Sequence, residues 1–93
     1  MRRIERTRQF KRDYKREAHG ERSDTLDAAL LPILAALAED RALATPQRDH
    51  ALSGRWKNHR DCHVRPDLVR VYRKPGDDVL QLVRLGSHSE LGL

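Results

Sequence analysis

The chain has 93 residues and carries 19 Lys and Arg against 14 Asp and Glu, a formal net charge of +5. This length allows a single small domain over residues 1–93, and the basic surface favours a polyanion such as RNA or DNA as a partner. No stretch has the apolar length of a membrane span or a secretory signal, so we expect no membrane contact and a cytoplasmic location. The single cysteine, Cys62, excludes an internal disulfide and a Cys-based zinc finger.

The beginning of the chain predicts a short edge strand followed by a helix. Residues 2–6 can form the strand. Thr7 has a side chain suited to cap a helix over residues 8–18. Gly20 follows this segment and is typical of a helix end. We therefore expect the first helix to be bounded by these two residues.

A second helix is predicted to begin at a cap on Ser23 or Asp24. Its apolar residues repeat with the spacing of one buried helix face. They are Leu26, Leu30, Ile33, Leu34 and Leu37. Pro32 lies inside this pattern and lacks the backbone N–H that a helix interior uses, so it predicts a kink or a late helix start.

The second half of the chain changes from helical to strand periodicity. Residues 41–54 are typical of a loop, and three strands are predicted over residues 60–64, 68–73 and 79–85. Residues 86–93 form a tail without a clear period. The order of elements predicts an α+β fold, in which two N-terminal helices pack on a twisted antiparallel β-sheet.

Four of the five histidines lie in this second half, together with several Asp, Arg and Lys residues. Histidine both accepts and donates protons near neutral pH. Cleavage of RNA by attack of its own 2′-OH needs a base, an acid for the leaving oxygen and positive charge on the phosphate. These residue types supply that set without a metal ion.

A zinc site is the competing interpretation of the histidines. His59 and His63 have the four-residue spacing of a helical zinc pair. The alternating pattern predicts a strand, however, in which they would lie about 13 Å apart. The same alternation places His63 on the face opposite Cys62 and Val64. We therefore expect neither a metal ion nor another cofactor.

Residues 49–72 carry a spaced motif that resembles the core of YafQ-type toxins, members of the RelE/ParE superfamily of toxin–antitoxin modules. The motif reads Asp49-His50-x-Leu52-x-Gly54-x-Trp56-Lys57-x-x-Arg60-Asp61-x-His63-Val64-x-Pro66-Asp67, followed by Val71-Tyr72 and Arg84-x-Gly86-x-His88. The resemblance covers nearly the whole chain in element order. It implies a ribosome-dependent mRNA endonuclease with a small α+β fold, no metal, and a 2′,3′-cyclic phosphate product.

Carried over position by position, the resemblance implies the catalytic residues His50, His63, Asp67, Arg84 and His88. His88 would transfer one proton, the other two histidines and Asp67 would share the second transfer, and Arg84 would hold the phosphate.

Basic residues outside the catalytic set are the candidates for RNA and ribosome contacts. They are Arg8, Lys11, Arg12 and Lys15 in the first helix, and Lys57 and Arg60 in the motif. A merely solvated helix face is the alternative for the first four.

The resemblance also implies a cognate antitoxin that wraps around the toxin, and contact with operator DNA through that complex. One position departs from the family, because Gly92 stands where an aromatic residue usually follows the last histidine by four. Two other functions stay open. One is a ParE-like toxin that inhibits DNA gyrase, and the other is a weakened toxin that acts as an antitoxin- or DNA-binding module.

Overall fold

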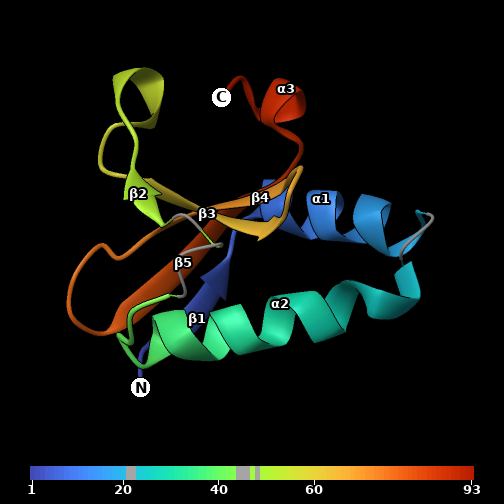
Figure 1. The fold of residues 1–93 in the computed structure, drawn as a ribbon. Coiled ribbons are helices and arrows are strands. Elements are labelled where there is room, and N and C mark those ends of the chain that lie inside the picture. Colours follow the sequence, from blue (N-terminus) through green and yellow to red (C-terminus); the bar gives the residue numbers. More distant parts are fainter. Residues whose placement is uncertain (21–22, 44–46, 48) are drawn as a thin grey trace.

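The computed structural model describes residues 1–20, 23–43, 47 and 49–93, and it packs helices against a five-stranded sheet (Figure 1). The first elements are β1 (Arg3–Arg6), α1 (Arg8–Ala18) and α2 (Ser23–Ala38). The remaining elements are β2 (His50–Ala51), a 3-10 turn η2 (Gly54–Trp56), β3 (Arg60–Arg65), β4 (Leu68–Arg73), β5 (Val79–Gly86) and α3 (His88–Leu91).

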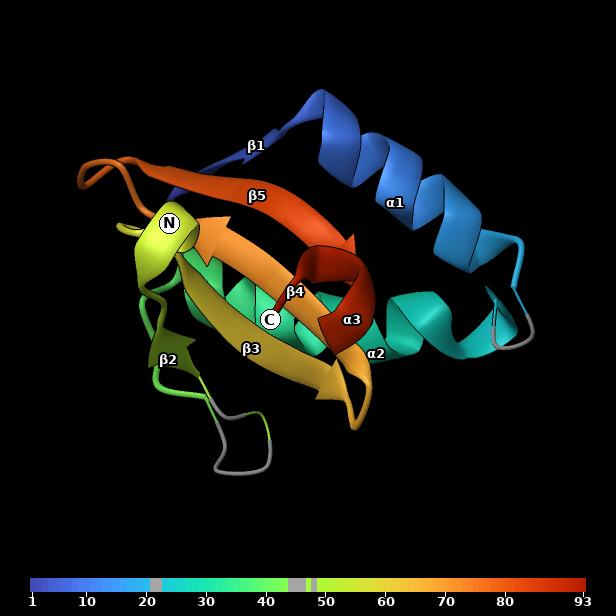
Figure 2. The ribbon, with the colours of Figure 1, turned by 90° about the horizontal axis from the view of Figure 1, so that it is seen from above.

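The sheet has the strand order β1-β5-β4-β3-β2. Strands β2 to β5 are antiparallel neighbours, whereas β1 runs parallel to β5. Figure 2 shows α2 on one side of the sheet and α3 on the other, with α1 beside β5. The predicted α+β class is therefore confirmed, with one difference: the first strand makes the sheet mixed rather than wholly antiparallel.

Helix α1 has the bounds that the sequence predicts. The Thr7 side chain accepts a hydrogen bond of 3.1 Å from the Phe10 amide, which satisfies one free N–H of the first turn. The first residues after the helix are His19, which forms its C-cap, and Gly20. Local capping chemistry therefore fixes both ends of this helix.

Helix α2 continues through Pro32, so the late helix start that this residue suggested is wrong. The proline ring and Ala28, whose carbonyl loses its helical partner, are both exposed, and water can satisfy that carbonyl. The predicted cap at Ser23 or Asp24 involves side chains outside the described residues. No described helix, α2 included, has the length and apolarity to span a membrane.

The main core lies between the sheet and the two long helices. Its fully buried members from the sheet include Cys62, Tyr72, Leu80, Leu82 and Leu85. The helices contribute Phe10, Leu26, Leu30, Ile33 and Leu37. Burial raises the pKa of the Cys62 thiol to about 12, which leaves it a packing residue rather than a nucleophile. The predicted alternation of β3 is confirmed, because Cys62 faces this core and His63 does not.

The end of the chain is ordered, so the featureless tail predicted for residues 86–93 is wrong. Strand β5 extends to Gly86, and Ser87 then caps α3. The Ser87 hydroxyl accepts from the Glu90 amide, and the Glu90 carboxylate accepts from the Ser87 amide. This reciprocal pair is a capping box, and its Ser-x-x-Glu pattern was readable in the sequence.

Candidate active site

Strand pairing brings distant polar residues into one row across the sheet. His50 in β2 pairs with Asp61 in β3, Asp61 pairs with Val71 in β4, and Val71 pairs with Arg84 in β5. Directly paired residues point to the same face, here the face opposite α2. The predicted loop over residues 41–54 therefore contains a short strand, while its residues 44–46 and 48 lie outside the described residues.

Two histidines meet on this face. His63 Nε2 in β3 lies 3.3 Å from His88 Nε2 at the start of α3, with the ring centroids 4.9 Å apart. His88 Nδ1 lies 3.0 Å from Asp67 Oδ1, in the turn between β3 and β4. The result is a linear contact chain of a carboxylate and two imidazoles, all partly open to solvent. Three of the five predicted catalytic residues are thus in direct contact.

The ionised state of Asp67 determines which nitrogen atoms of His88 and His63 carry protons. The hydrogen bonds from the His88 side chain and backbone amide lower the pKa of Asp67, so it is an ionised acceptor at neutral pH. His88 must therefore carry its proton on Nδ1. Its Nε2 then shares a single proton with Nε2 of His63. One ring presents an N–H and the other a lone pair, which is what an acid–base pair requires.

The fourth predicted residue, His50, joins this group through Asp61. Its Nδ1 lies 2.9 Å from Asp61 Oδ1, and the carboxylate is almost fully buried. Burial raises the pKa of Asp61, and electrostatic interactions with His50, His63 and His88 oppose that shift, so all three rings act on this one carboxylate. The sequence interpretation left Asp61 out of the catalytic set. The signal was present, because Asp61 shares the strand face of His63.

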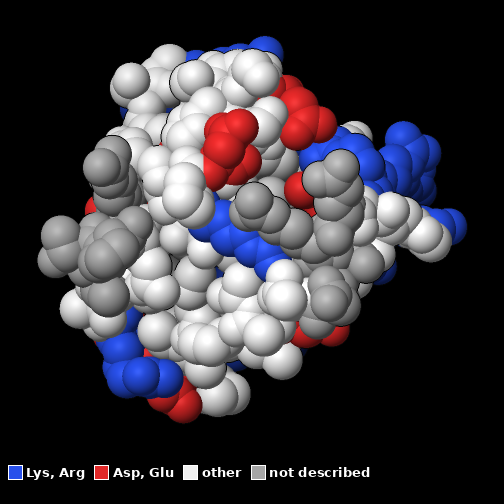
Figure 3. Space-filling view, turned by 45° about the vertical axis from the view of Figure 1, so that its right-hand side comes forward, with Lys and Arg blue, Asp and Glu red and all other residues white. Residues whose placement is uncertain are grey.

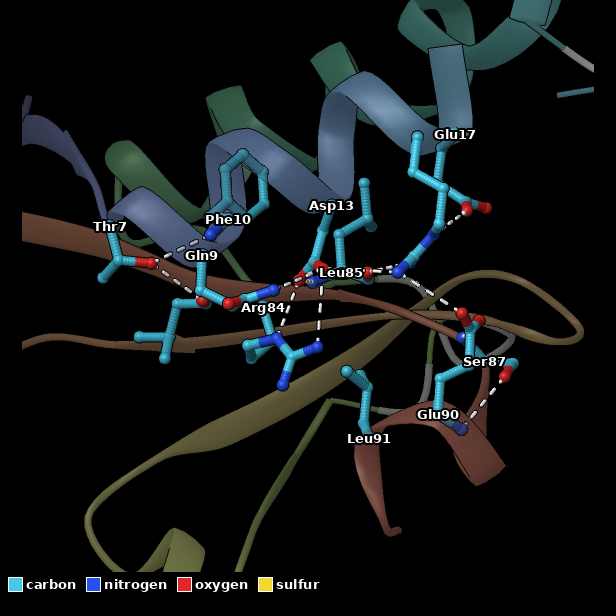
Figure 4. A network of polar contacts seen from close by, with 12 residues as sticks. Thr7, Gln9, Phe10, Asp13, Glu17, Arg84, Leu85, Ser87, Glu90 and Leu91 are labelled. Carbon is cyan, nitrogen blue, oxygen red and sulfur yellow. Dashed lines mark hydrogen bonds and ion pairs between the residues drawn. The ribbon is translucent and has the colours of Figure 1, made fainter. Parts of the chain in front are cut away.

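Arg84, the fifth predicted residue, is held on the α1 side of the row (Figure 4). Its Nε donates to Asp13 Oδ2 at 2.7 Å, and its Nη2 lies 3.4 Å from Asp13 Oδ1. The third guanidinium nitrogen points away from Asp13 in Figure 4. The Asp67–His88–His63 contacts do not include Arg84, but its charge faces the same side of the sheet.

Asp13 is a buried anchor that the sequence interpretation did not identify. Burial by itself would raise its pKa, but hydrogen bonds from Arg84, the Leu85 amide and Gln9 outweigh that effect and lower it. The Leu85 amide donates to Asp13 at 3.0 Å. Strand β1 ends before this part of β5, so the Asp13 side chain satisfies an edge amide that no strand covers.

Residues of the 3-10 turn η2 hold the end of the short helix α3. Leu91 is fully buried, and its carbonyl accepts hydrogen bonds from Arg55 and Trp56 at 3.2 and 3.3 Å. Gly92 ends the helix with a φ of 70°, and a Cβ built there would lie 3.0 Å from Arg55 Nη2. At the position where the resemblance implies an aromatic residue, this chain therefore has a glycine cap that leaves room for the arginine.

The predicted RNA-binding residues fall into two groups. Four exposed cations lie on α1, and Figure 3 shows blue side chains gathered on the right, where this helix lies. We call them the α1 cations: Arg8, Lys11, Arg12 and Lys15. Lys57 is exposed, while Arg60 donates to Asp49 at 3.1 Å. The described residues contain no group of three His, Cys, Asp or Glu side chains arranged to hold a metal ion.

Comparison with known proteins tests the resemblance over the whole chain. Residues 2–92 match the sequence model of a family described as bacterial toxin of type II toxin–antitoxin system, YafQ. The chain belongs to the YafQ family. The match includes every strand and helix of the described structure and all residues of the histidine cluster, so the motif in residues 49–72 is part of a full-length similarity.

Individual relatives agree with this assignment. The mRNA interferase toxin YafQ of Escherichia coli K12 is 32% identical over 90 residues, which cover 95% of this chain and 97% of that protein. The putative toxin YafQ of Haemophilus influenzae is 45% identical over 49 residues, which cover 50% of this chain and 48% of that protein. A crystal structure of the E. coli DinJ–YafQ complex contains a chain with 31% identity and a TM-score of 0.79, with 98% of each chain covered.

Proposed function

We propose that this member of the YafQ family cleaves mRNA and that His63, His88 and Asp67 are its acid–base machinery. The observation that carries the proposal is the 3.3 Å contact between the two Nε2 atoms, with Asp67 behind one of them. The E. coli relative that covers most of this chain is named an mRNA interferase toxin. We assign the same activity to this chain because it carries the acid–base side chains that the reaction needs.

The proposed reaction uses the two imidazoles in turn. One Nε2 takes the proton of the ribose 2′-OH, the 2′ oxygen attacks the neighbouring phosphorus, and the bond to the 5′ oxygen breaks. The other ring, which must be an imidazolium for this step, gives its Nε2 proton to that leaving oxygen and becomes neutral. The products are a 2′,3′-cyclic phosphate and a 5′-hydroxyl end. Proton exchange between the two Nε2 atoms then restores the pair, so no external acid or base is consumed.

We assign to Arg84 the role of bringing positive charge to the phosphate. Its Nε and Nη2 are committed to Asp13, which holds the guanidinium plane, and the remaining nitrogen is available to a phosphate oxygen. His50 is assigned a position beside the reacting ribose, because it lies in the same row and is held by Asp61. The α1 cations, Lys57 and Arg60 are assigned to the RNA backbone of the substrate and the ribosome.

The proposal includes partners and a place of action. YafQ of E. coli has been crystallised with DinJ, and we propose that this chain is likewise held by a cognate antitoxin. We further propose that it cuts mRNA on translating ribosomes, which places it in the cytoplasm, and that operator DNA is reached through the antitoxin complex. A freely active nuclease on translated mRNA would stop the growth of its host, so a bound inhibitor follows from the activity itself.

Primer extension on a translated mRNA tests the proposal, with purified protein and with or without ribosomes. We expect cuts only with ribosomes. His63→Gln and His88→Gln should each lower the cleavage rate by about 10²–10⁴-fold, the usual contribution of one general acid or base. The double variant should lose little more than either single variant, because residues that act as one unit are not additive.

The matched control is His19→Gln, the same change at an exposed histidine that caps α1. It should cleave like the unaltered chain. Cleavage within about threefold of normal in the double variant would contradict the assigned roles. If the unaltered chain shows no cleavage in either condition, a supercoiling assay with DNA gyrase and an operator-binding assay decide between the two other functions considered for the sequence.

A further inference from the structure

A pocket lies on the opposite face of the sheet from the histidines. Its volume is about 360 Å³, and it lies between α1 and α2, with β4 and β5 behind it. Its apolar walls come from both helices and β5, and they are Phe10, Tyr14, Leu30, Leu31, Leu34 and Leu82. This size is at the lower end of the range for small-ligand pockets. None of the proposed catalytic residues lines it, but Lys11, one of the α1 cations assigned to the RNA backbone, does.

A buried, unpaired arginine lines this pocket. Arg70 lies in β4 between Val69 and Val71, whose side chains face the histidine site, so its guanidinium projects to the helix side. It is 1% exposed. Nη2 donates to the Leu30 carbonyl at 3.3 Å, but Nε and Nη1 have no hydrogen-bond partner. The described part of the chain supplies no carboxylate to it.

Such an arrangement is costly without a ligand. Arginine remains protonated in proteins, and an ion buried without a partner loses several kcal/mol of hydration. Burial lowers the pKa of Arg70, which reflects the same loss. Two further cations, Arg6 and Lys11, line the pocket against a single carboxylate, Asp27. Asp27 already accepts a hydrogen bond of 2.5 Å from Tyr14.

We infer that this pocket binds a carboxylate carried on an apolar group, with the carboxylate on Arg70 and the apolar group against the leucines of α2. An anion would pair with the Arg70 N–H groups that have no partner and would offset the buried charge. The apolar walls favour a singly charged group on a hydrocarbon body over a phosphate, because the hydration of a doubly charged ion is too expensive to remove here. Two sources share this chemistry: an acidic side chain beside an apolar one in a bound protein segment, and a free amphipathic acid.

The first experiment uses octanoate as the probe and 1-octanol as its uncharged counterpart. Both are titrated into the full chain and followed by amide chemical shifts in NMR spectra. Octanoate should shift the signals of Leu30, Leu82 and Arg70, with an affinity at least about 10-fold above that of octanol. Equal affinity for the two probes, or octanoate shifts that avoid these three residues, would overturn the inference. This readout needs no variant.

The second experiment replaces the arginine. Arg70→Met removes the charge and keeps an apolar side chain of similar length, a change that is often neutral or stabilising for a buried unpaired ion. The control is Arg73→Met in the same strand, whose side chain lies outside the pocket and donates to Gln81. Octanoate affinity should fall at least about 10-fold for the first variant and stay unchanged for the second. Unchanged affinity in a cooperatively unfolding Arg70→Met protein would refute the site.

A third experiment identifies the source, and it alone rests on the proposed function. Octanoate is titrated into the chain purified together with its antitoxin. Loss of octanoate binding in the complex assigns the carboxylate to an antitoxin segment, whereas unchanged binding assigns it to a free acid. The mRNA cleavage rate of Arg70→Met is measured separately. That rate should be unchanged, so a failure of the cleavage proposal and a failure of the pocket proposal give different results.

Discussion

The carboxylate of Asp13 is the point at which helix α1, strand β5 and the candidate phosphate-binding arginine are joined (Figure 4). Replacing it by asparagine keeps the shape of the side chain and removes its charge. Asp13 Oδ2 accepts from Arg84 Nε at 2.7 Å and from the Leu85 amide at 3.0 Å, and Oδ1 accepts from Gln9 at 3.2 Å. An asparagine offers one oxygen to these donors and turns an NH₂ toward the others.

The expected cost follows from the groups left without a partner. A charge-assisted hydrogen bond to Arg84 contributes about 1.5–3 kcal/mol, and a buried amide left unsatisfied at Leu85 costs about 1–3 kcal/mol. Their sum agrees with the about 3–5 kcal/mol found when one member of a buried ion pair is removed. Because Arg84 keeps partial access to water, we expect Asp13→Asn to lower the free energy of unfolding by about 3 kcal/mol. In a domain of this size the melting temperature should fall by about 12–24 °C.

Urea unfolding followed by circular dichroism measures this directly, and the slope with denaturant should be unchanged between variants. Asp40→Asn is the matched control. It is the same chemical change at an exposed carboxylate that contacts Arg2 and Lys74, and asparagine tolerates the positive φ of 56° at this position. The control should leave the unfolding midpoint nearly unchanged. A loss below about 1 kcal/mol for Asp13→Asn would refute the reasoning that joins β5 to α1 through this carboxylate.

The pH dependence gives a second check with a definite sign. The folded protein lowers the pKa of Asp13 below its ordinary value of 3.8, so its contribution to stability is present above that value and disappears as the pH falls through the folded pKa. The difference in stability between the unaltered chain and Asp13→Asn should therefore be full at pH 7 and shrink below about pH 4. A difference that grew on acidification would contradict the assignment.

Two further predictions concern the site. Ser87→Ala removes the cap of α3 and should cost about 1 kcal/mol of stability, and it should also slow mRNA cleavage because His88 is the next residue. Ser53→Ala is its control, since this residue precedes η2 without a side-chain capping bond and its change should alter neither quantity. Replacing the α1 cations together by glutamine should weaken ribosome binding and flatten its dependence on salt, measured by co-sedimentation between about 50 and 200 mM salt. An unchanged salt dependence would leave them as a solvated helix face.

Local patterns determined much of this protein from the sequence alone. The bounds of α1 follow from Thr7 and Gly20, and the alternation of β3 places Cys62 in the core and His63 on the opposite face. Capping and strand alternation depend on neighbours a few residues apart, which is why they are readable without coordinates. The spaced motif likewise indicated the family, and the match over residues 2–92 confirms it.

Only the tertiary structure decided how the site is assembled. Asp67 and His88 are 21 residues apart, and Asp13 and Arg84 are 71 apart, so each contact depends on the packing of whole elements. The register of β4 and β5 shifts between Val71 and Tyr72, which pair with Arg84 and Leu82. This bulge turns Arg84 to the face of the histidines, because one extra residue reverses the side on which a strand presents its side chains. No local pattern in the sequence indicates the extra residue, since it is set by pairing between strands and not by the strand itself.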